Sequence, residues 1–124
     1  MKILDFNKTK LYYEQLGEDD LCNCEGCENY IRKIKRTYPK LSKYLLSLGV
    51  DIEKPFEIMY IGPDENTNIE YLIVQYLMCG NVDNFESKVI EEFTIDISKS
   101  HPSSTFDEEH FIIDVYPIKS RWIM

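Results

Sequence analysis

Three cysteines within six residues are the feature of this 124-residue chain with the clearest chemical potential. Cys22, Cys24 and Cys27 stand in the stretch DLCNCEGCENY, and the fourth cysteine, Cys79, lies far downstream. Thiolates bind soft metal ions and attack disulfides, and both chemistries are open to free cysteines in a reducing compartment. This stretch is therefore the first candidate for a functional site.

The residues around the cluster predict that it lies at the amino-terminal end of a helix. Asn23 is a favourable N-cap residue, which would make Cys24 the first helical residue and Cys27 the fourth. Residues just before the cap and at the fourth helical position commonly touch, so Cys22 should approach Cys27, while Cys24 and Cys27 share one face. The partial positive charge of a helix amino terminus also favours the thiolate form. All three sulfurs are expected to converge.

Zinc is the first interpretation of this convergence, because tetrahedral Zn²⁺ accepts three or four cysteines, with histidine as an alternative fourth ligand. The predicted metal ligands are Cys22, Cys24, Cys27 and Cys79. His101 and His110 are the alternatives for the fourth position. A ligand from the strand region, such as Cys79, would fasten the helix to a sheet. An iron–sulfur cluster would use the same sulfurs but needs four good ligands, so it ranks below zinc.

Two other interpretations of the cluster stay open. Cys24-Glu25-Gly26-Cys27 has the spacing of a CxxC redox pair at a helix start, although no βαβ unit surrounds it. Alternatively, the cysteines only fill a helix end as small apolar residues. With two histidines and no defensible Ser/His/Asp or Cys/His spacing, nucleophilic catalysis has little support, and we assign no catalytic residue.

Hydrophobic periodicity predicts two consecutive helices around and after the cluster. Apolar residues from Cys27 to Tyr38 recur at helical spacing, which predicts a helix over residues 24–37. Pro39 suits the first turn of a second helix, predicted over residues 39–48, and Gly49 is its expected left-handed stop.

The rest of the chain alternates with the period of strands. The predicted strands are residues 10–16, 56–61, 69–79, 93–97 and 111–116. The second and third should pair as a hairpin around the turn-forming Gly62-Pro63-Asp64. Residues 83–92 are ambiguous, and a strand from about residue 90 is favoured. We predict one α+β domain over residues 1–124, with two N-terminal helices packed on a mainly antiparallel β-sheet.

Charge and composition limit the partners. The net charge is −8 at neutral pH, and residues 51–124 carry fifteen acidic against five basic side chains, so nucleic acid is an unfavourable partner. Neither a signal peptide nor an apolar run of membrane-spanning length is found, which predicts a soluble, cytoplasmic protein without a membrane partner. A protein partner stays open, and the oligomeric state is not predicted.

Several short sequence segments of this chain together resemble those of a known protein family. The segment from Cys22 to Tyr30, a Tyr38-Pro39 pair, the passage SLGVDIEKP over residues 47–55 and a late Trp122 resemble a family of small bacterial proteins that has no assigned activity. The resemblance covers most of the chain and implies a shared fold and a shared thiol site, but no substrate. The sequence thus favours a non-enzymatic binding or accessory module with a zinc site, with a thiol redox protein as the alternative.

Overall fold

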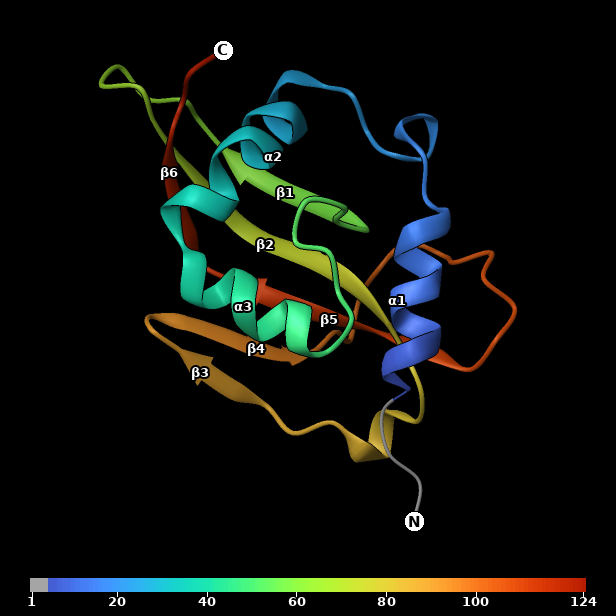
Figure 1. Ribbon diagram of the computed structural model, residues 1–124. Coiled ribbons are helices and arrows are strands. Elements are labelled where there is room, and N and C mark those ends of the chain that lie inside the picture. The colour runs from blue at the N-terminus through green and yellow to red at the C-terminus, as the bar shows by residue number, and fades with distance from the viewer. Residues whose placement is uncertain (1–4) are drawn as a thin grey trace.

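The computed structural model describes residues 5–124, which form helices first and one antiparallel sheet afterwards (Figure 1). The helices are α1 (Phe6–Gln15), α2 (Glu25–Thr37) and α3 (Pro39–Ser47). The strands are β1 (Glu57–Ile61), β2 (Asn68–Cys79), β3 (Lys88–Ile90), β4 (Phe93–Ile97), β5 (His110–Tyr116) and β6 (Ile118–Arg121). The chain therefore has the predicted α+β composition with an antiparallel sheet.

The long strand β2 organises the sheet, whose order is β1-β2-β5-β4-β3 with β6 also on β2. β1 pairs with one side of β2, which confirms the predicted hairpin. β5 and β6 follow one another along the other side, and both keep the same register across Pro117, with Val74 opposite Val115 and Tyr71 opposite Ile118. Pro117 has no N–H to donate to the ladder, so the strand divides there.

The segment after β2 differs from its prediction. Instead of one strand from about residue 90, β3 and β4 form a hairpin that turns at Glu91 and Glu92. Glu91 has a φ of 55°, in the left-handed region, and this reverses the chain at the point where the predicted strand begins. Alternation alone does not reveal a two-residue turn made of glutamates.

α2 and α3 lie over the same face of the sheet, and their apolar residues share one core with it (Figure 1). The apolar residues of the two helices that are buried there are Cys27, Tyr30, Ile34, Leu41 and Leu45. Tyr30 Oη lies 2.5 Å from Tyr76 Oη, which donates to the Ile52 carbonyl at 2.7 Å. Because Tyr76 has one hydroxyl proton, Tyr30 is the donor between them, and both buried hydroxyls are satisfied.

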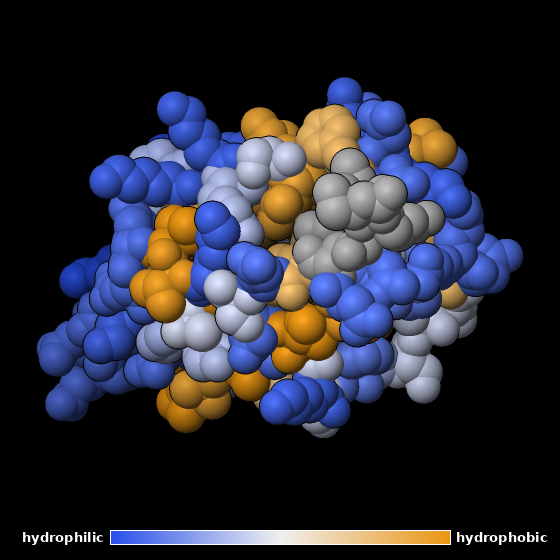
Figure 2. Space-filling view, turned by 90° about the horizontal axis from the view of Figure 1, so that it is seen from below, coloured by the Kyte–Doolittle hydropathy of each residue, from blue (hydrophilic) through white to orange (hydrophobic). Residues whose placement is uncertain are grey.

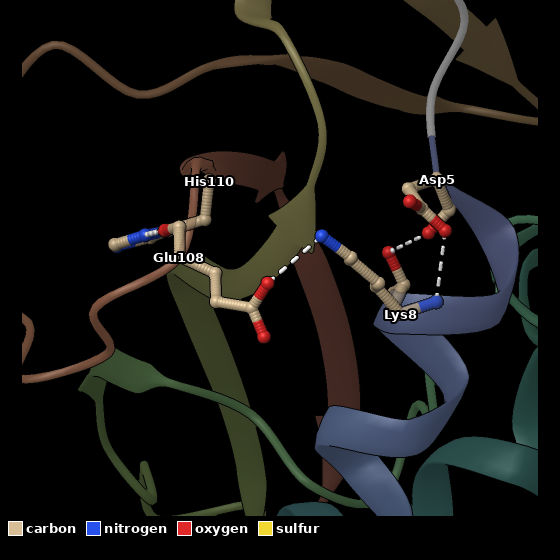
Figure 3. A network of polar contacts seen from close by, with 5 residues as sticks. Asp5, Lys8, Glu108 and His110 are labelled. Atoms are coloured by element: carbon tan, nitrogen blue, oxygen red, sulfur yellow. Dashed lines mark hydrogen bonds and ion pairs between the residues drawn. The ribbon is translucent and has the colours of Figure 1, made fainter.

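The prediction of a strand at residues 10–16 is wrong, because these residues lie in α1 and in the turn that ends it. Asp5 starts the helix, since its side chain accepts the Lys8 N–H at 2.9 Å (Figure 3). Thr9 and Tyr13, four residues apart, are the buried face. The dense aromatic residues suggested a strand, but their burial follows the helical period.

α1 completes the hydrogen bonding of β2 beyond the end of β1, whose pairing reaches only to Gln75. Tyr13 Oη accepts from the Leu77 N–H at 3.0 Å and donates to the Leu77 carbonyl at 2.8 Å. Thr9 Oγ1 accepts from the Cys79 N–H at 3.0 Å, and the Asp5 N–H donates to the Cys79 carbonyl at 3.1 Å. A helix thus occupies the place of an edge strand.

The surface seen in Figure 2 is mixed, with hydrophobic residues in separate groups between hydrophilic ones. No helix in the described part of the chain has the length and apolar character needed to cross a membrane.

Replacing Tyr13 by Phe is expected to lower the free energy of unfolding by about 1–3 kcal/mol, because the buried N–H and C=O of Leu77 both lose their partner. Urea denaturation measures the change. Tyr12→Phe is the matched control, since Tyr12 is half-buried and its ring packs against Phe106. Equal stability of the two variants would contradict the role of the Tyr13 hydroxyl.

Candidate metal centre

The sulfur atoms of Cys22, Cys24 and Cys27 all lie within 4.8 Å of one another. Cys22 and Cys24 are exposed, whereas Cys27 is only 6% exposed. The predicted convergence at the start of a helix is therefore present, and the three cysteines could hold a metal ion. All the cysteines are free thiols.

The cap of α2 differs by one residue from the prediction. Cys24, not Asn23, is the N-cap, and its Sγ accepts the Cys27 N–H at 3.4 Å. Cys27 is consequently the third helical residue instead of the fourth. A sulfur that carries negative charge can replace the usual oxygen at this position, because the helix start offers free N–H groups and a partial positive charge.

Gly26 lets an aromatic ring lie against the first turn of α2. A Cβ atom at Gly26 would collide with the ring and hydroxyl of Tyr60, which comes from β1. Tyr60 is 37% exposed, so this contact lies at the surface of the protein. Residue 26 must therefore lack a side chain for this contact to form.

Asn29 fastens the first turn of α2 to the sheet and is fully buried. Its Nδ2 donates to Tyr71 Oη at 2.9 Å and to the Arg121 carbonyl at 3.0 Å, and its Oδ1 accepts the Ile123 N–H at 2.8 Å. Tyr71 Oη in turn donates to the Gly26 carbonyl at 3.1 Å. The backbone between the cysteines is thus fixed to β2 and to the end of the chain.

The thiols of Cys24 and Cys27 have different electrostatic environments. Burial opposes ionisation of Cys24, but hydrogen bonds from the N–H groups of Cys27 and Gly26 and from the neighbouring thiols outweigh it, so the pKa of Cys24 is lowered. Burial raises the pKa of Cys27, and the hydrogen bonds and negative charge of Cys24 and Cys22 raise it further. Three neighbouring thiolates therefore need a cation to coexist.

The predicted fourth ligand, Cys79, is not part of this cluster. It is fully buried and packs with Leu77 and Ile112 in a second core cluster. Successive strand residues point to opposite faces, so Cys79 lies on the face opposite Tyr76, which packs under the helices. The structure thus brings together three of the four predicted ligands.

The two alternative fourth ligands also lie elsewhere. His110 is paired with Cys79 at the far end of β2, and its Nδ1 lies 2.6 Å from the Glu108 carbonyl, close to the start of α1 (Figure 3). His101 Nδ1 lies 2.8 Å from the Pro102 carbonyl, and its ring faces Phe56. Neither histidine joins the three sulfurs.

Comparisons with protein-family models, with curated proteins and with solved structures find no match to this chain. The resemblance to small bacterial proteins stays a prediction, and the function has to be argued from the geometry of the cluster.

Sequence reasoning missed the residues that position the cluster: Gly26, Asn29, Tyr60 and Tyr71. Only Gly26 left a signal, because a glycine inside the first turn of a helix indicates a close approach by another group. Nothing in the sequence indicates that Asn29 is buried, since asparagine is usually exposed and its partners lie 42 and more residues away.

The contact between Gly26 and Tyr60 predicts that Gly26→Ala changes the free energy of unfolding in opposite directions with and without the Tyr60 ring. Alanine favours a helix by about 1 kcal/mol over glycine, so Gly26→Ala should stabilise a Tyr60→Ala protein by up to that amount. In the wild-type background the new methyl group displaces the Tyr60 ring, and the gain is expected to vanish or turn into a loss. Chemical denaturation of the four proteins of this double-mutant cycle measures the coupling. Additive effects would contradict the contact.

Proposed function

We propose that this protein is a non-enzymatic, metal-binding accessory module whose α2 start holds one zinc ion through Cys22, Cys24 and Cys27. The observation that carries the proposal is the convergence of three sulfurs within 4.8 Å. Zn²⁺ is a borderline-soft ion without redox chemistry that prefers thiolate and imidazole ligands, and it compensates the charge of neighbouring thiolates.

The anchoring of the site supports a structural role. Asn29 and Tyr71 hold the first turn of α2 against the sheet, while Cys22 belongs to the segment between α1 and α2. An ion bound by all three cysteines would therefore join this segment to the rigid part of the molecule. The module would act in the cytoplasm, where thiols stay reduced, and through a protein partner.

Membership of the family of small bacterial proteins belongs to the same proposal. Its support is the CxCxxCxNY string, in which the residues after the last cysteine also have a physical role. Asn29 and Tyr30 are both buried and hydrogen-bonded to the sheet residues Tyr71 and Tyr76. The string would therefore combine three ligands with two residues that hold the ligands in place.

The decisive measurement is elemental analysis of protein purified without an affinity metal or a chelator. We expect about one zinc per chain, and loss of that zinc in Cys24→Ser together with a lower melting temperature, because metal binding stabilises the folded state. Cys79→Ala is the matched control: it removes a sulfur outside the cluster, so the zinc content should not change even if stability falls. Metal-free protein with freely titrating thiols would refute the proposal.

A redox function of Cys24 and Cys27 is the second candidate, favoured by the exposure of Cys24 and by its hydrogen bond from the Cys27 N–H. The Cys24 thiolate would attack one sulfur of a substrate disulfide and release the other as a thiolate. Cys27 would then lose its proton and attack Cys24 Sγ in the mixed disulfide, which forms a Cys24–Cys27 disulfide and releases the second substrate sulfur as a thiolate. Cys27 is buried and its pKa is raised, which disfavours this second step and ranks the redox function below zinc binding.

Oxidation by a small disulfide separates the two candidates. We expect the zinc-loaded protein to resist the reagent, because bound thiolates are shielded, and the metal-free protein to form a Cys24–Cys27 disulfide that mass spectrometry can locate. Rapid and reversible oxidation of protein that still carries one zinc per chain would favour the redox function.

A further inference from the structure

The cluster supplies three ligands to an ion that prefers four. Among the side chains that the structure describes, no histidine, carboxylate or fourth cysteine joins Cys22, Cys24 and Cys27. Zinc sites with three protein ligands keep a position for a water molecule or another exchangeable ligand. Two of the three cysteines are exposed, so this position can be reached from the solvent.

A small hollow of about 40 Å³ lies beside the cluster and shows what kind of ligand fits there. Cys22 and Cys27 form part of its lining, together with the apolar side chains of Leu21, Ile31, Pro55, Phe56 and Ile58. The remaining lining residues are two acids, Asp20 from the segment before the cluster and Glu57 from β1. The hollow is therefore lined by two cysteines, five apolar residues and two acidic residues. Each acid also accepts a backbone N–H, Asp20 Oδ2 from Gly17 and Glu57 Oε1 from Ile58.

The charges of the hollow select the ligand. Zn²⁺ with three thiolates carries one net negative charge, and a fourth thiolate adds another, next to Asp20 and Glu57. An anionic thiol such as a mercapto acid would meet repulsion from both carboxylates. A thiol with an ammonium group would be attracted by them, because opposite charges at short range stabilise each other.

We propose that the fourth ligand of the metal is an external small aminothiol, whose sulfur binds the ion and whose ammonium group lies near Asp20 and Glu57. The inference rests on the proposed zinc site. On binding, the thiol releases its proton to the solvent, the new metal–sulfur bond forms and the bond to a water ligand breaks. The module would thus be a receptor for small amine-bearing thiols.

The test uses the full chain loaded with Co²⁺, which reports its ligands in the visible and near-ultraviolet spectrum. The probes are 2-aminoethanethiol, 2-mercaptoethanol and mercaptoacetate, titrated at the same pH with the bound cobalt measured after each titration. We expect the sulfur-to-cobalt charge-transfer band to grow as a fourth thiolate binds. The apparent affinity should be about tenfold higher for 2-aminoethanethiol than for mercaptoacetate, equivalent to about 1.4 kcal/mol.

Variants that remove single charges test whether the preference for 2-aminoethanethiol comes from the acids of the hollow. Glu57→Gln should reduce the tenfold preference to a few-fold, and Asp20→Asn should act in the same direction. Glu109→Gln removes an equal charge outside the hollow and should leave the preference unchanged. All variants must bind one cobalt per chain.

The outcomes separate the inference from the proposed function. If cobalt binds but no thiol changes its spectrum, if the three thiols bind equally, or if they only extract the metal, the external aminothiol is refuted while the metal site stands. A spectrum of four protein ligands before any thiol is added refutes it too. If cobalt does not bind at all, both proposals fail.

Discussion

The hydrogen bonds of Asn29 are the constraint on which the rest of the site depends. One buried amide joins α2, β2, β6 and the end of the chain, and all its donors and its acceptor are used. A buried amide without partners would cost several kcal/mol, so this arrangement specifies one position of the helix on the sheet. Tyr71 also holds the Gly26 carbonyl in place by a hydrogen bond. The backbone between Cys24 and Cys27 is therefore fixed relative to the sheet.

A fixed backbone matters because the thiols themselves oppose the arrangement. Burial and neighbouring negative charge both disfavour the thiolate of Cys27, so the cluster cannot be held together by its own sulfurs. The sheet supplies the missing stability through Asn29 and through the aromatic contact of Tyr30 with Tyr71. The backbone that carries Cys24 and Cys27 is therefore positioned without an ion, which would lower the entropy cost of binding one.

Local sequence patterns predict the elements whose structure depends on neighbouring residues. They fail for elements whose structure depends on contacts with distant parts of the chain. The helices at residues 24–37 and 39–48 and the hairpin of β1 and β2 follow from periodicity. The convergence of the three cysteines follows from their position at a helix start, although the cap is Cys24 and not the predicted Asn23. The aromatic residues of α1 predict a strand, but Tyr13 serves to bond the edge of β2, 64 residues away, from a helix. The prediction of Cys79 as a ligand fails because no local pattern shows on which face of the sheet the end of β2 places its side chains.

The side-chain hydrogen bonds of α1 also affect the order in which the molecule can fold. Thr9 and Tyr13 bind partners 70 and 64 positions later in the chain, so α1 is synthesised well before the strand that it covers. An isolated ten-residue helix is marginal in water, and its contacts with β2 require closure of a long loop. The first helix in the sequence is therefore among the last elements to dock, and until then the end of β2 is open to pairing with other chains.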